Sequence, residues 1–119
     1  MQLNPVATVL AAISIVGGIA IPFGDPQFVD RAIALELTFV ALTVLIYNGF
    51  RRALYACIPL AILVIIGNSL APPHVEIMTT FSKPFNAAIL IIGGYILQAV
   101  LIATTIKALR SYKIVQNAN

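Results

Sequence analysis

Long stretches without a charged side chain constrain this chain more than any other feature. No Asp, Glu, Lys or Arg occurs in residues 1–24, 53–70 or 84–106. A helix of roughly 20 apolar residues crosses the hydrocarbon core of a bilayer. The composition agrees, because 61% hydrophobic and 9% charged residues depart strongly from a soluble globule. We therefore expect an all-α polytopic membrane protein that forms one domain over residues 1–119.

A further stretch, residues 28–48, is equally apolar except for Asp30, Arg31 and Glu36. It follows the turn signal Gly24-Asp25-Pro26, in which proline removes a backbone donor before a new helix. Short connections make successive helices antiparallel neighbours. The sequence thus predicts four transmembrane helices in an antiparallel up-down bundle. They cover about 4–23, 28–48, 53–70 and 85–108, with an outer loop at 71–84 and a cytoplasmic tail at 109–119.

The basic residues predict the orientation in the membrane. Cytoplasmic segments of membrane proteins carry an excess of Lys and Arg, and most of the seven basic residues fall on one predicted side. Both termini are therefore expected in the cytoplasm of a multi-pass cell-membrane protein. This side holds Arg51, Arg52, Lys107, Arg110 and Lys113, and the other holds Arg31 and Lys83. The net charge of +3 reflects this topology rather than nucleic-acid binding.

Glu36 is the residue most in need of an explanation. An acid within a spanning helix costs about 2.5 kcal/mol or more and is a functional-site hypothesis by default. It lies about 12 Å along its helix from Phe28, and Thr43 shares its helical face. With Asn68 and Gln98 on the next helices, these residues could line an ion or proton path, because burial lets a carboxyl exchange a proton. A network that merely packs the helices explains the same residues equally well.

The remaining polar residues carry weaker signals. Asp30 and Arg31 form an interfacial pair in the first turn of their helix, where charges stay hydrated. His74 and Glu76 are too few for a metal site, so a solvated loop histidine is the better interpretation. The segment that follows His74 forms either a short interfacial helix or a surface loop. The single Cys57 offers no disulfide, and no phosphate loop, catalytic triad or haem ligation appears. We expect no metal, no cofactor and no enzyme activity of the chain alone.

The stretch Gly24 to Leu37, GDPQFVDRAIALEL, resembles the start of the second helix in the F subunit of Mrp-type multisubunit cation/proton antiporters. Related small subunits occur in membrane-bound hydrogenases. Asp30 and Arg31 match the Asp-Arg pair of that family, and Glu36 stands where the family usually has Asp. The resemblance covers roughly the first 50 residues, and the family usually has three helices rather than four. It implies a small subunit that contributes to Na⁺ or H⁺ translocation.

A different class of function fits the same composition. The chain could be a structural or assembly subunit of a respiratory or oxygenase complex, or a hydrophobic coat protein of an archaeal virus. In either case Glu36 would be a satisfied contact between helices. Because four helices bury too little to form a sealed pore, both classes predict other membrane subunits as partners, within the lipid bilayer.

Overall fold

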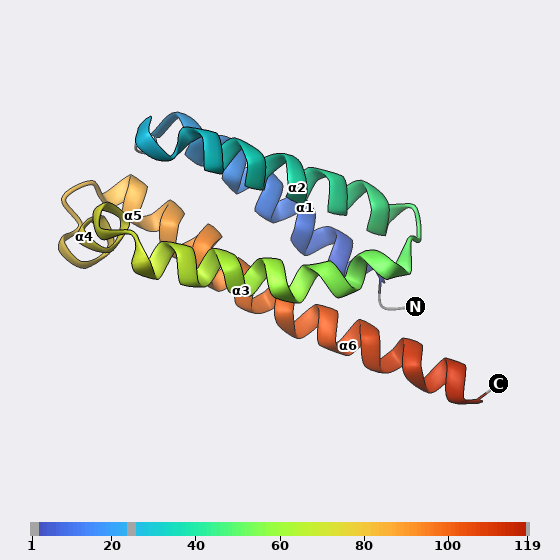
Figure 1. Ribbon diagram of the computed structural model, residues 1–119. Coiled ribbons are helices and arrows are strands. Elements are labelled where there is room, and N and C mark those ends of the chain that lie inside the picture. Colours follow the sequence, from blue (N-terminus) through green and yellow to red (C-terminus); the bar gives the residue numbers. More distant parts are fainter. Residues whose placement is uncertain (1–2, 24–25, 119) are drawn as a thin grey trace.

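A computed structural model describes residues 3–23 and 26–118, with the side chains of residues 4–23 and 26–111 (Figure 1). The described chain is helical and contains no strand. Its elements are the helices α1 (Leu3–Ala20), α2 (Val29–Tyr47), α3 (Leu54–Leu70), α4 (Pro72–Thr80), α5 (Pro84–Ile91) and α6 (Leu97–Ala118), the 3-10 turns η1 (Ile21–Phe23), η2 (Pro26–Phe28) and η3 (Arg51–Ala53), and the π-helical segment η4 (Ile92–Ile96). The all-α class predicted from the sequence is confirmed.

Within the described residues, three helical segments are long and apolar enough to cross a membrane. They are Asn4–Phe23, Arg51–Leu70 and Pro84–Ser111. Helix α2 has 19 residues and matches them in length, but Asp30, Arg31 and Glu36 make its composition more polar. The structure therefore supports a membrane protein with three strongly apolar helices and one helix that carries charge.

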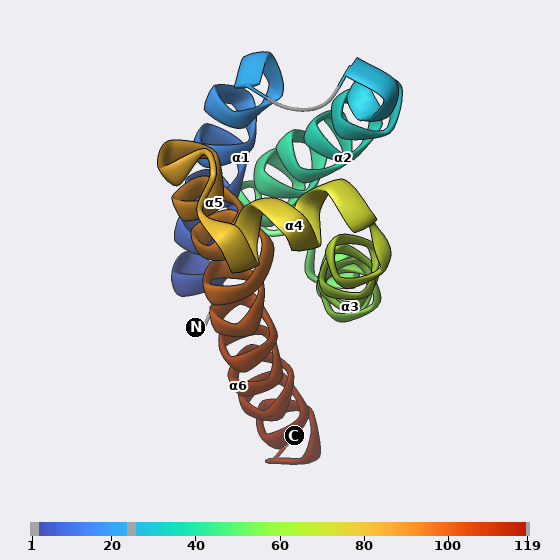
Figure 2. The same ribbon diagram turned by 90° about the vertical axis from the view of Figure 1, so that its left-hand side faces the viewer.

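The long helices associate as two pairs. Helix α2 packs along α1, and α3 packs along α6, while α1 also contacts the continuous rod formed by α5, η4 and α6. Figure 2, which looks along the molecule, shows α2 and α3 apart on one side, with α4 running across this end. The two pairs are thus held together mainly through α1 and the α5–α6 rod.

The hydrophobic core fills the end of the molecule at which α1 begins and α2 ends. Small core residues recur at four-residue spacing, at Ala53 of η3 and at Cys57 and Ala61 of α3, and they let a neighbouring helix approach closely. The larger core side chains come from the other helices and from the start of α3. They are Val6, Leu10 and Ile13 of α1, Phe39, Leu42 and Ile46 of α2, Leu54 of α3 and Leu101 of α6.

The connections differ in part from the sequence prediction. Gly49 reverses the chain between α2 and α3 with a φ of 84°, a conformation that glycine adopts without steric cost. The expected outer loop 71–84 contains α4, because Pro72 occupies the first turn of a new helix, where its missing donor is harmless. The expected tail 109–119 continues α6 as a helix through Ala118, and Figure 1 shows this helix projecting beyond the others.

The packed end should dominate stability. Leu10 is fully buried, whereas Leu37 is 64% exposed. Replacement Leu10→Ala should lower the free energy of unfolding by about 2 kcal/mol or more, because it leaves a cavity that the neighbours cannot fill. The same replacement at Leu37 should change it by less than about 0.5 kcal/mol. Unfolding of the detergent-solubilised protein measures both, and equal losses would contradict this description of the core.

Candidate functional site

A cavity of about 680 Å³ lies at the α4 end, bounded by residues of every described helix. Its walls are mostly hydrocarbon, and Ile13 and Phe39 belong both to the cavity wall and to the packed core. The cavity therefore ends where the core begins. Its ionisable and amide-bearing lining residues are Arg31, Glu36, Asn68, His74, Lys83, Asn86 and Gln98.

The Glu36 side chain reaches from α2 to the backbone of α1. A Cβ added at Gly17 would collide with Glu36 Oε2, and one added at Gly18 would lie 3.7 Å from Glu36 Oε1. Glycine thus provides the space in which the carboxylate lies. Among the described residues, no hydrogen-bond donor and no cation is paired with this carboxylate. The carboxylate lies half-buried in the cavity wall, and its oxygens can accept further hydrogen bonds.

Asn68 repeats this arrangement on the opposite pair of helices. Its carboxamide lies against Gly94 of η4, where an added Cβ would collide with Nδ2. The neighbouring hydroxyls of Ser69 and Tyr95 are 2.9 Å apart and link α3 to η4. Gly17, Gly18 and Gly94 therefore receive polar side chains from adjacent helices, whereas Gly93 faces Val16 of α1.

Gln98 owes its position to the π-helical segment. The N–H of Leu97 bonds to the carbonyl of Ile92, which interrupts the regular α-helical ladder. The Gly93 carbonyl accepts the Gln98 Nε2–H at 3.0 Å. Gln98 is 1% exposed, and its Oε1 has no hydrogen-bond partner within the described structure. Single π-helical turns inside α-helices occur frequently at functional sites.

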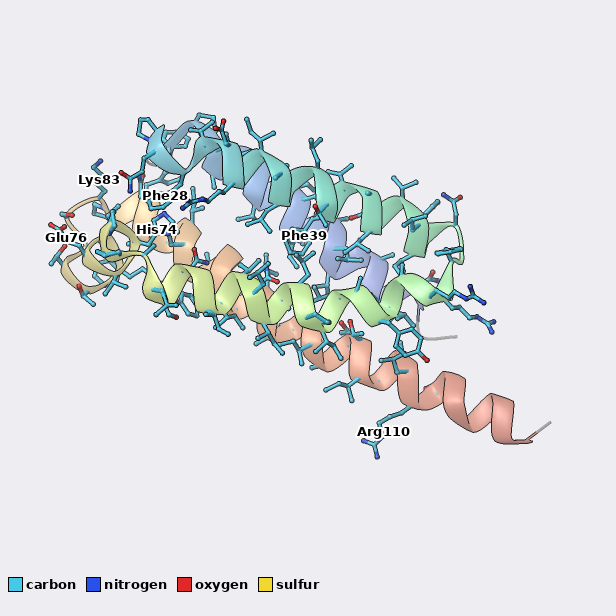
Figure 3. The ribbon with its side chains drawn as sticks, viewed as in Figure 1. Phe28, Phe39, His74, Glu76, Lys83 and Arg110 are labelled. Atoms are coloured by element: carbon cyan, nitrogen blue, oxygen red, sulfur yellow. The ribbon has the colours of Figure 1, made fainter. Side chains whose placement is uncertain are left out.

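Basic and aromatic side chains gather at the α4 end of the cavity, as Figure 3 shows for Phe28, His74 and Lys83. The Arg31 guanidinium lies 5.5 Å from the centre of the Phe28 ring, a cation–π geometry. His74 packs on the same ring at 5.1 Å. The interpretation of His74 as a solvated loop residue was therefore wrong, because it lies half-buried in helix α4.

An interhelical contact also closes this end near η1. The Asn86 side chain donates from Nδ2 to the Phe23 carbonyl at 2.7 Å. The rings of Phe23 and Phe85 meet edge to face at 5.0 Å. Residues 85 and 86 are thereby fixed beside the end of α1.

The structure brings together most of the sequence-predicted path. Glu36, Asn68 and Gln98 line one cavity, whereas Thr43 does not. The Thr43 hydroxyl instead donates to the Phe39 carbonyl at 2.7 Å and lies 3.4 Å from the Ser14 hydroxyl. Of the predicted interfacial pair, Arg31 lines the cavity, while Asp30 is exposed outside it.

Several residues that line the cavity were not predicted from the sequence. Lys83 and Asn86 stood in or beside a predicted loop, and nothing local marked them as lining residues. Gly17 and Gly94 did carry a signal, because paired glycines permit close approach. That signal did not say whether a helix or a polar side chain would fill the space.

The polar lining of the cavity carries both signs of charge. Arg31 and Lys83 donate hydrogen bonds only, whereas the Glu36 carboxylate accepts only. The site can therefore bind a proton, a hydrated cation or an N–H donor at Glu36. No group of three or more His, Cys, Asp or Glu side chains suited to a metal ion occurs in residues 3–23 and 26–118.

Comparisons with known proteins give no match to a protein-family model, to a curated protein or to a solved structure. The similarity of residues 24–37 to an antiporter subunit therefore stays an expectation from the sequence. Residues 24 and 25 of that stretch lie outside the described residues.

The contact between Gly17 and Glu36 predicts how the carboxyl reacts. Replacement Gly17→Ala should push the carboxyl off α1 into the cavity and increase its labelling by a hydrophobic carbodiimide several-fold. The melting temperature should change little, because the displaced group is the end of a flexible side chain. Gly67→Ala is the matched control, since nothing lies within 4 Å of a Cβ added there. Equal labelling of both variants and the wild type would contradict this geometry.

Proposed function

We propose that this chain crosses the membrane four times, with α2 as the second span and both termini in the cytoplasm. The length of α2 and its packing along α1 support its assignment as the second span. Asp30 and Arg31 lie in its first two turns, at the end of the molecule that also carries Lys83. Charges near a helix end can remain hydrated at the membrane surface.

The same orientation explains the other basic residues. Arg51 and Arg52 lie in η3, and Arg110 lies near the end of α6, which Figure 3 draws at the far end from Lys83. This excess of positive charge at one end is typical of cytoplasmic segments.

Within this topology, we propose that the chain is a small subunit of a larger membrane complex and contributes to Na⁺ or H⁺ translocation through Glu36. The observation that carries the proposal is the Glu36 carboxylate, which lies against Gly17 in a cavity that Asn68 and Gln98 also line. An acid at such a position is costly and marks ion or proton pathways in membrane proteins. The resemblance of residues 24–37 to antiporter F subunits points in the same direction.

The packed core explains why a partner is required. Phe39, Leu42 and Ile46 fill the space beyond the cavity, so the described chain provides a half-channel at most. An ion that reaches Glu36 must leave the same way or pass to a neighbouring subunit. The same closed core favours the alternative, a structural or assembly subunit without transport chemistry, for which the cavity would be filled by lipid or by a partner.

Cysteine labelling tests the topology, in a Cys57→Ala background. Pro26 and Ser82 are exposed at one end and Asn48 at the other. Pro26→Cys and Ser82→Cys should react with a membrane-impermeant maleimide on intact cells, and Asn48→Cys only after permeabilisation. Reaction of Pro26→Cys and Asn48→Cys from the same side would show that α2 does not cross the membrane.

Neutralising Glu36 tests the function. The complex that copurifies with the chain from its native membrane should lose cation or proton exchange in proteoliposomes by about 100-fold or more with Glu36→Gln, because proton transfer at the carboxyl is lost. Subunit composition should not change, since Gln is nearly isosteric. Glu76→Gln is the matched control, because Glu76 is exposed on α4 outside the cavity lining. Full exchange activity in an intact Glu36→Gln complex would favour the assembly role.

A further inference from the structure

We propose that the cavity binds an amphipathic organic cation, namely an apolar amine whose N–H groups are accepted by Glu36. This inference goes beyond ion translocation and does not depend on it. It rests on the unpaired Glu36 carboxylate, the size of the cavity and the distribution of charge within it.

The unpaired carboxylate indicates a ligand that donates hydrogen bonds. Glu36 lies half-buried in the cavity lining, and its carboxylate meets no donor among the described residues. A protonated amine supplies both N–H donors and the charge that complements Glu36.

The size and the walls of the cavity indicate an apolar body. A volume of about 680 Å³ falls in the usual range for small-molecule sites and far exceeds what a proton or a bare cation occupies. Leu63, Val64 and Ile89 are among its hydrocarbon lining. Water could satisfy the Glu36 carboxylate, but water that fills the cavity would wet these apolar walls, which is unfavourable. An alkyl or aryl group covers them.

The positive charge at the α4 end of the cavity limits the ligand to one ammonium group. Arg31 lines the cavity beside Phe28, and Lys83 lines it toward α4, so a second ammonium group placed there would meet like charges. A monoamine can direct its apolar end toward Phe28 and its ammonium toward Glu36. A diamine of the same length cannot avoid repulsion at one of its ends.

The test is equilibrium dialysis of radiolabelled n-octylamine against the full chain in phosphatidylcholine nanodiscs, with empty nanodiscs as the background. Wild-type protein should bind octylamine at one saturable site, and unlabelled octylamine should compete at least about tenfold better than n-octanol or 1,8-diaminooctane. Glu36→Gln should weaken octylamine binding by about tenfold or more, because a charged hydrogen bond is lost. Glu76→Gln should bind like the wild type.

A second variant separates loss of the site from loss of the fold. Glu36→Asp keeps every cavity charge but shortens the side chain by one methylene, so it should weaken octylamine binding several-fold in protein that elutes as the wild type does. Octanol binding equal to octylamine binding, or unchanged octylamine binding in Glu36→Gln, would overturn the proposal and leave a cavity that lipid fills. Because no ion gradient is present, these results are independent of whether the complex transports ions.

Discussion

The placement of the Glu36 carboxylate is the constraint on which the cavity and the proposed site depend. An acidic group among apolar helices requires space, and no donor side chain in the described residues is paired with it. Space comes from Gly17 and Gly18, which let the carboxylate lie on the backbone of α1. Helix α2 packs along α1, and Asn68 and Gln98 line the same cavity as Glu36.

The molecule is consequently divided into two unlike halves. One half has interlocking apolar side chains, with Leu10, Leu54 and Leu101 almost completely buried, and it provides a rigid base. In the other half, α2 and α3 lie apart, and the cavity opens between the helices at the α4 end. Rigid packing at one end and open volume at the other is an arrangement that can hold a ligand or an ion without loss of the fold.

Much of the fold could be predicted from the sequence because charge is so unevenly distributed. Uncharged runs identify three apolar helices, and the cost of placing an acid in a fourth is enough to single out Glu36. The predicted helix limits differ from those of α1, α2 and α3 by a few residues at most. Local sequence is sufficient for these limits, because hydropathy and proline positions determine where such helices begin and end.

The remaining features depend on tertiary contacts that no local pattern specifies. The pairing of α1 with α2 and of α3 with α6 cannot be read from four similarly apolar helices. His74 lies in α4 rather than in the expected loop, and its ring packs on Phe28. The Thr43 hydroxyl donates to a carbonyl of its own helix and lies near the Ser14 hydroxyl. The π-helical segment that positions Gln98 contains Gly93 and Gly94, and no local pattern in the sequence predicted it.

The most direct measurement is a solid-state NMR carbon–carbon correlation between Glu36 Cδ and Gly17 Cα, recorded on the selectively labelled chain in lipid bilayers. A direct cross-peak at short mixing time is the result expected here. Absence of the cross-peak would place the acid away from the α1 backbone and contradict the central claim.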